Sequence, residues 1–113
     1  MEKFMFLFRG GNFRSLSPEL MQQHMQKWIN WMETLRSKNI LVGSEPLHPT
    51  GAVVSGKNKI VTDGPFIEEN EMIGGYTIIL AHDIDHALAI SHDCPIFEMD
   101  GKLEVRPLRP IIR

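Results

Sequence analysis

The stretch "KFMFLFR", residues 3–9, decides the fold because apolar side chains alternate onto both of its faces. Successive side chains of a β-strand point to opposite faces, so three phenylalanines lie on one face and a methionine and a leucine lie on the other. The glycines Gly10 and Gly11 end the run. A strand that is apolar on both faces is typical of a sheet that is covered on both sides.

A long amphipathic helix is predicted after this strand. Ser17 suits the N-cap, Pro18 suits the first helical position, and the helical periodicity continues to about Lys38. The apolar stripe of this helix recurs at spacings of three and four and consists of Met21, His24, Met25, Trp28, Trp31, Met32 and Leu35. The stripe predicts that the helix packs on the sheet.

Strand patterns account for most of the remaining chain. We expect a strand over 40–47, a hairpin that pairs 53–54 with 59–62, a bend at "TDGPF" (62–66), a strand "YTIILA" (76–81) and a last strand "KLEVRPL" (102–108). Gly74 and Gly75 are expected to release the chain from an acidic loop, 67–73, that carries Glu68, Glu69 and Glu71 and is a candidate lid. A short second helix is predicted to begin after Asp83 or Asp85 and to end at Pro95.

The order of these elements is strand, helix, strand, hairpin, strand, helix, strand. This order is typical of an α+β fold of the ferredoxin-like, split-βαβ kind, and we expect residues 1–113 to form one domain. Two helices can cover only one face of such a sheet, yet the first strand is apolar on both faces. A second copy packed sheet on sheet is the simplest cover, so we predict a homodimer.

Composition and charge narrow the class of partner. The formal net charge of −2 provides no basic surface for nucleic acids or anionic membranes, so a small-molecule ligand or a protein is expected instead. The single cysteine, Cys94, cannot form an internal disulfide, and its sequence neighbours favour a passive thiol over a nucleophile. With no signal-peptide pattern and no membrane-spanning run, we expect a cytoplasmic protein.

His24 and Asp63 are the candidate catalytic residues, and each has two interpretations. A histidine inside an apolar stripe is commonly a core residue with a satisfied hydrogen bond, but beside a carboxylate it can act as a general acid or base. An aspartate before glycine is common in turns, although a rigid turn can also aim a carboxylate into a site.

Other chemistry-bearing residues give weaker signals. His82 and His86 in "HDIDH" have a spacing that can chelate a metal on a helix, but His82 is expected to precede the helix, so we predict neither a metal site nor a cofactor. Arg9 and Arg106 are candidates for binding an anionic group of a substrate; the alternative is that they are solvated or paired with acids such as Glu104.

Five motifs in order carry a family resemblance: "HMQKWINWM" (24–32), "GSEPL" (43–47), "TDGPF" (62–66), "GGY" (74–76) and "EVRPL" (104–108). Together they resemble the YCII-related family in its DGPF-domain branch, from Phe4 to about Leu108. The resemblance implies a ferredoxin-like fold that forms a dimeric α+β barrel. It also implies a cleft between the first helix and the sheet in which His24 and Asp63 face each other as an acid/base dyad.

Two functions follow as hypotheses. The first is a small-molecule enzyme of lyase or isomerase type, in which His24 transfers a proton, Asp63 orients it, and Trp28 and Phe66 contact an aromatic or phenolic substrate. The second is a non-catalytic module that binds a ligand or a transcription-related partner. Proteins of the DGPF branch often occur near sigma factors, which implies a functional association of that kind.

Overall fold

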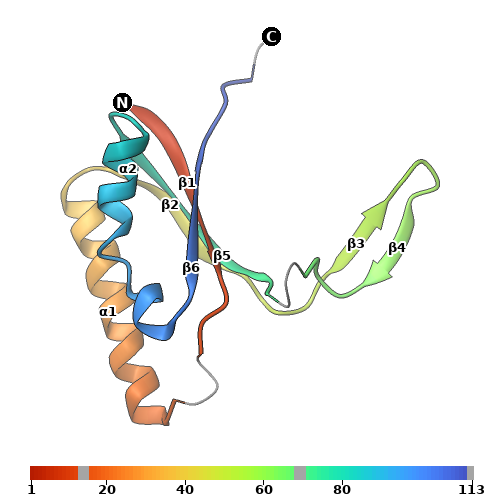
Figure 1. Ribbon diagram of the computed structural model, residues 1–113, viewed down its shortest axis with the longest axis horizontal. Helices are drawn as coiled ribbons and strands as arrows, with labels where there is room; N and C mark the ends of the chain where they lie inside the picture. The colour runs from red at the N-terminus through yellow and green to blue at the C-terminus, as the bar shows by residue number, and fades with distance from the viewer. Residues whose placement is uncertain (13–15, 68–70, 112–113) are drawn as a thin grey trace.

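The computed structural model describes residues 1–12, 16–67 and 71–111 of the chain (Figure 1). Its elements in chain order are β1 (Glu2–Arg9), α1 (Pro18–Ser37), β2 (Leu41–Pro46), β3 (Ala52–Ser55), β4 (Ile60–Asp63), β5 (Ile73–Ala81), α2 (Ile84–Ser91), the 3-10 helix η2 (Pro95–Met99) and β6 (Lys102–Pro107). The sequence-based prediction of an α+β fold with two α-helices is confirmed. No helix within the described ranges combines the length and the apolar character needed to cross a bilayer.

Four strands form one antiparallel sheet in the order β2-β5-β1-β6. The first strand of the chain therefore lies in the centre, where Phe4 is paired with Ile79 on one side and with Pro107 on the other. Helices α1 and α2 and the short η2 all lie on one side of this sheet (Figure 1). The main hydrophobic core lies between the sheet and these helices.

The helix-covered face of the sheet is closely packed. Phe4, Phe6 and Phe8 of β1 are at most 7% exposed, and the buried Trp31 of α1 stacks on Phe6 with ring centroids 6.2 Å apart. Thr77 on β5 is fully buried on the same face, where its hydroxyl group lies 2.8 Å from that of Ser44 on β2. The alternation in the β1 sequence therefore matches the two faces of the sheet, and the three phenylalanines face the helices.

Local sequence signals explain the position of α1. The Ser17 hydroxyl accepts a hydrogen bond from the Leu20 backbone N–H at 3.2 Å, and Pro18 occupies the first turn, where no N–H donor is needed. His24, Trp31 and Leu35 of the predicted stripe are buried. The stripe is narrower than predicted, because Met25 is 51% exposed.

The opposite face of the sheet, which we call the outer face, carries the other side chains of β1 and β5. Met5 is paired with Ile78 and Leu7 with Tyr76, and all four side chains are partly exposed. No helix of the described residues covers them (Figure 1). The prediction that the helices leave one face of the sheet without cover is therefore confirmed.

Strands β3 and β4 form a separate two-stranded sheet, which we call the hairpin arm (residues 52–63). The arm leaves the main sheet on the side away from the helices (Figure 1). Its pairing was predicted, but β4 begins one residue later than expected, at Ile60, and extends to Asp63. None of its strand residues is buried, and Val54, Ile60 and Val61 are each more than 60% exposed.

Two expectations from the sequence are wrong. Gly74 and Gly75 do not release the chain into a strand but belong to β5, which begins at Ile73. A Cβ atom at Gly75 would lie 3.0 Å from the carbonyl oxygen of Glu45, so close strand contact explains this glycine. The second helix does not extend to Pro95 but ends at Ser91, and Pro95 begins the separate 3-10 helix η2, which precedes the last strand. Of the predicted acidic loop, Glu68, Glu69 and Asn70 lie outside the described residues.

Candidate functional site

A cavity of about 450 Å³ lies beneath α1, at the β2 and β5 edge of the sheet. We call it the α1 cavity. Its walls are mostly apolar and include Phe8, Met25, Trp28, Ile29, Met32 and Ile96, with Glu33, Arg36 and Ser44 among its polar residues. A concave, mainly apolar space with a few polar groups is the usual form of a small-molecule site. Trp28 is the one residue predicted to contact a substrate that lines this cavity.

His24 lies directly behind the Trp28 wall. The two residues are one helical turn apart on α1, and the Trp28 indole Nε1–H donates a hydrogen bond of 2.9 Å to His24 Nε2. Because the indole N–H can only donate, Nε2 carries a lone pair and the proton of the neutral ring is on Nδ1. The His24 side chain is 4% exposed and therefore contacts the α1 cavity through Trp28.

The carboxylate of Glu98 on η2 lies close to this imidazole. His24 Nδ1 lies 3.9 Å from Glu98 Oε2, and Lys27 Nζ donates to the same oxygen at 2.9 Å. Burial lowers the pKa of His24 below its usual value; Glu98 opposes this shift and Lys27 adds to it. The imidazole is therefore held in its neutral form, with a partly exposed acid near its protonated nitrogen.

A second depression, of about 610 Å³, lies between α1, α2 and η2. Lys27 and Glu98 belong to its lining, together with the buried Cys94. Burial raises the pKa of the Cys94 thiol to about 12, so the thiol stays protonated and inert near neutral pH, as the sequence predicted.

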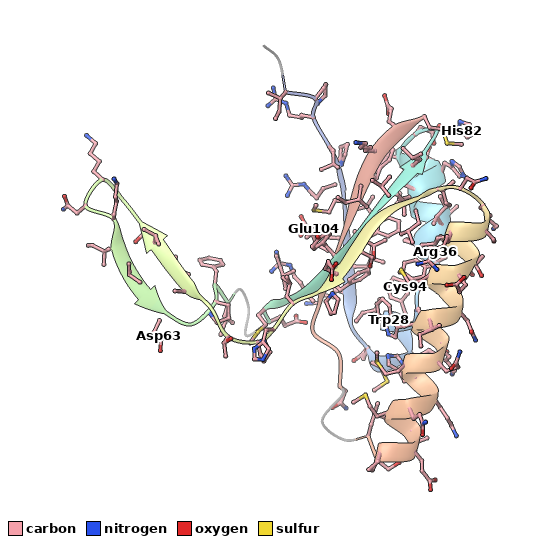
Figure 2. The ribbon with its side chains drawn as sticks, turned by 180° about the vertical axis from the view of Figure 1, so that it is seen from behind. Trp28, Arg36, Asp63, His82, Cys94 and Glu104 are labelled. Carbon is pink, nitrogen blue, oxygen red and sulfur yellow. The ribbon has the colours of Figure 1, made fainter. Side chains whose placement is uncertain are left out.

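The structure does not bring Asp63 and His24 together within one chain. Asp63 is the last residue of β4, is exposed, and lies on the hairpin arm, far from Trp28 and the helices (Figure 2). Its turn role is visible at the next residue, because Gly64 has a φ of +88° and donates its N–H to the carbonyl oxygen of Gly51. Phe66, predicted to contact substrate, is 70% exposed at the base of the arm.

Arg9 and Arg106 lie on the outer face of the sheet, not in the α1 cavity. Both pair with Glu104: Arg9 at 3.6 Å and Arg106 at 3.2 Å. Pairing with this acid is the alternative that the sequence left open for the two arginines.

Glu71 has a structural role that the sequence did not reveal. It accepts a hydrogen bond of 2.7 Å from Lys102 Nζ and lies against Gly10, where a Cβ atom would collide with its carboxylate oxygen. Gly10 lines the α1 cavity and has a φ of +68°. Glu71 thus links the segment that follows the "TDGPF" bend to the end of β1, beside the α1 cavity.

The rings of His82 and His86 stack, with centroids 4.9 Å apart, although His82 precedes α2 as predicted. His86 Nδ1 accepts a hydrogen bond from the His82 backbone N–H at 3.0 Å, which occupies one metal-ligating nitrogen. Among the described residues no group of three ligands surrounds a common point.

Glu98 is the main residue of the site that the sequence did not indicate. It lies far from His24 along the chain and reaches it because η2 folds back against α1. The available signal was local: Pro95 suits the first turn of a short helix, and Asp100, with a φ of +59°, suits its end. That signal places η2 in the sequence but does not indicate its packing partner.

The features of this site agree with a match to a known family. The family model of the YCII-related domain matches residues 5–112. The chain belongs to the YCII-related family. No match was found among curated proteins. Within this YCII-related domain, His24, Trp28 and Glu98 are the residues that the structure brings together next to the α1 cavity.

Proposed function

We propose that this YCII-related protein binds a small organic molecule with an aromatic or largely apolar body in the α1 cavity. The observation that carries the proposal is the cavity itself: about 450 Å³, walled by Phe8, Met32 and the indole of Trp28. That volume lies in the range of small-molecule pockets in proteins. The Trp28 ring is held edge-on to Phe8, with centroids 5.0 Å apart, so this part of the wall is already formed without ligand.

Calorimetric titration with 2-naphthol, a phenolic probe, tests this proposal. The variant Ile29→Phe enlarges a side chain that lines the cavity, whereas Leu88→Phe makes the same kind of change on α2, outside the cavity lining. We expect Ile29→Phe to weaken binding at least about tenfold, since about 1.4 kcal/mol corresponds to that factor, and Leu88→Phe to leave it unchanged. Equal affinities for the two variants, or no binding to the wild type, would contradict the proposal.

Acid/base catalysis by His24 is the second function that we propose, and a specific observation favours it. A neutral imidazole lies directly behind a cavity wall, and a carboxylate lies 3.9 Å from its other nitrogen. A base of lowered pKa is unprotonated at neutral pH and ready to accept a proton once Trp28 releases Nε2. In the predicted His24–Asp63 dyad, Asp63 would have to come from a second copy of the chain.

NMR titration of the His24 ring separates the contributions of the two acids. Removing the Glu98 charge by Glu98→Gln should lower the His24 pKa further, because Glu98 raises it. If Asp63 acts on the same ring, Asp63→Asn should also lower the pKa. An identical His24 curve in wild type and Asp63→Asn would exclude Asp63 from the site and leave Glu98 as the partner.

The proposed assembly is a homodimer packed sheet on sheet, as a ferredoxin-like dimeric α+β barrel. The strand order β2-β5-β1-β6 and the uncovered outer face support it. The "TDGPF" motif supports membership of the DGPF branch and, with it, a functional association with a sigma factor. A cytoplasmic location is proposed as well. Light scattering of the purified chain tests the dimer: a mass of one chain at high concentration would contradict it.

A further inference from the structure

Two small residues of the main sheet, Ser44 of β2 and Gly75 of β5, lie at the floor of the α1 cavity. Ser44 is paired with Thr77, and Thr77 is paired with Phe6, so the Ser44 side chain lies on the helix-covered face of the sheet. Gly75 is two residues before Thr77 and belongs to the same face, where it has no side chain. The small size of both residues leaves the space beneath α1 open.

Two hydrogen bonds fix the hydroxyl group of Ser44. Its oxygen lies 3.1 Å from the backbone carbonyl oxygen of Tyr76 and 2.8 Å from the hydroxyl oxygen of Thr77. A carbonyl oxygen can only accept, so Ser44 donates its single proton to Tyr76. Thr77 is 0% exposed, and within the described ranges its hydroxyl has no hydrogen-bond partner besides Ser44. Because a buried proton without an acceptor is costly, Thr77 donates to Ser44.

These two bonds determine what Ser44 can offer to a ligand. A serine hydroxyl has one proton and two lone pairs. The proton goes to Tyr76 and one lone pair accepts from Thr77, so the second lone pair is left for the cavity. A ligand group that meets Ser44 must therefore be a donor, such as a hydroxyl or an N–H. An ether, carbonyl or carboxylate oxygen in the same place would face a lone pair.

Arg36 is the other cavity residue that could select a ligand, and a guanidinium group favours carboxylates. Arg36 donates to the Glu33 carboxylate one helical turn away, and the two side chains are 61% and 62% exposed. The pair thus places both charges together at the rim of the cavity, where solvent and salt screen them. An anionic ligand would gain little from this exposed pair.

We propose that Ser44 is the specificity-determining residue of the α1 cavity and selects ligands that carry a hydroxyl or N–H donor on their apolar body. The body of the ligand lies over Gly75 against Trp28, and its donor binds the oxygen of Ser44. Thr77 is a positioning residue, because its buried proton keeps the Ser44 hydroxyl directed at the Tyr76 carbonyl. The inference rests on the proposed ligand site and adds the chemical class of its ligand.

Calorimetric titration with three related probes tests this selection. The probe 2-naphthol has a donor, 2-methoxynaphthalene has a methyl group in place of the donated proton, and 2-naphthoate carries a carboxylate on the same ring system. We expect the wild type to bind 2-naphthol at least about fivefold more tightly than either analogue, as the loss of one hydrogen bond predicts. Tighter binding of 2-naphthoate would assign the selection to Arg36 and overturn the role of Ser44.

A double variant removes the proposed selector without leaving a buried group unpaired. Ser44→Ala alone would leave the Thr77 proton without an acceptor, whereas Ser44→Ala with Thr77→Val removes both hydroxyls and is expected to fold. Its preference for 2-naphthol over 2-methoxynaphthalene should fall below about twofold. The matched control is Ser91→Ala on α2, which removes a buried serine outside the α1 cavity lining that also donates to a backbone carbonyl oxygen. This control should keep the full preference.

The positioning role of Thr77 has a test of its own. Thr77→Val replaces the hydroxyl by a methyl group, so the Ser44 hydroxyl becomes free to turn and to donate to an ether oxygen. We expect this variant to bind 2-methoxynaphthalene at least about twofold more tightly than the wild type does. Thr77→Ser keeps the hydroxyl and should match the wild type. Unchanged affinity in Thr77→Val would overturn the positioning role.

The outcomes separate this inference from the proposed function on which it rests. Absence of 2-naphthol binding to the wild type would overturn both. Equal affinities of the wild type for 2-naphthol and 2-methoxynaphthalene would overturn only the role of Ser44. A preference that the double variant retains would do the same, because it would trace the difference to the size of the added methyl group.

Discussion

The main sheet and the hairpin arm are both antiparallel β-structure made of similar residues, yet their environments differ completely. In β1 every second side chain is buried from Phe4 to Phe8, whereas no strand residue of the arm is buried. Valine and isoleucine favour strands in both places, so propensity alone does not separate them. The comparison shows that two strands can pair through local sequence alone, whereas the burial of their side chains depends on which other parts of the protein pack against them.

The largest contrast between the two regions should appear in alanine substitutions. Phe6→Ala removes a fully buried ring and should lower the free energy of unfolding by about 3 to 5 kcal/mol. Val61→Ala removes a side chain that is 67% exposed and should change the stability of the dilute chain by less than about 1 kcal/mol. Urea denaturation of the two variants measures both values. Similar losses would mean that the arm is covered within its own chain.

Two glycines with positive φ give a smaller contrast. Gly56 at the tip of the arm has a φ of +75° with open space around it, so Gly56→Ala should cost only the left-handed backbone penalty of about 1 to 2 kcal/mol. Gly10→Ala carries the same penalty and must also move the Glu71 carboxylate; because this carboxylate ends a flexible side chain and its ion pair with Lys102 is partly exposed, we expect an excess loss of at most about 1 kcal/mol.

A double-mutant cycle checks the reason for this difference. Adding Glu71→Ala to Gly10→Ala should recover the extra stability that Gly10→Ala loses relative to Gly56→Ala. Adding Glu71→Ala to Gly56→Ala should recover no stability. Additive effects in both pairs would show that the Glu71 contact does not explain the requirement for Gly10.

Acidification should affect the main sheet and its helices through His24. Its pKa is lowered in the folded state, so the unfolded chain takes up this proton first as the pH falls below about 6.5. Stability should therefore decrease from pH 7 downwards until the folded pKa is passed, with a slope of at most about 1.4 kcal/mol per pH unit from this group. The variant His24→Gln, whose amide oxygen can still accept from Trp28, should lose this part of the slope. If the stability of the wild type and of His24→Gln depended on pH in the same way, this prediction would be wrong.

The smallest effect is a chemical one without any change in stability. Cys94 in the core should react with a thiol reagent at pH 8 only as fast as the chain unfolds, because it is 4% exposed and its pKa is about 12. Ser55→Cys on the arm should react at once in the folded protein. Rapid labelling of Cys94 in the wild type would show that the core opens far more readily than its packing indicates.

Most of the fold could be predicted because its signals are local. The start of α1 follows from Ser17 and Pro18, and the two faces of β1 follow from simple alternation. What failed depends on contacts between distant segments. Two consecutive glycines such as Gly74 and Gly75 are typical of a loop that precedes a strand. In the structure both belong to β5, where Glu45 and Pro46 lie too close to Gly75 for a side chain there.

The candidate site divides in the same way. His24 and Trp28 are one helical turn apart, so their proximity could be read from the sequence. Glu98 could not be found, because nothing in "PIFEM" indicates which helix it will contact. The dyad with Asp63 stays a prediction, since the residue is exposed at the end of β4, on an arm that has no buried strand residue.

The central position of β1 has a consequence for how the protein is made. Phe4 is synthesised before both of its partners, and Ile79 and Pro107 are added roughly 4 to 20 seconds after it at ordinary rates of translation. During that interval an unpaired strand with three phenylalanines is exposed, and such segments promote aggregation between nascent chains. The basic residues at its two ends, Lys3 and Arg9, act as gatekeepers that keep neighbouring copies apart until the last strand arrives.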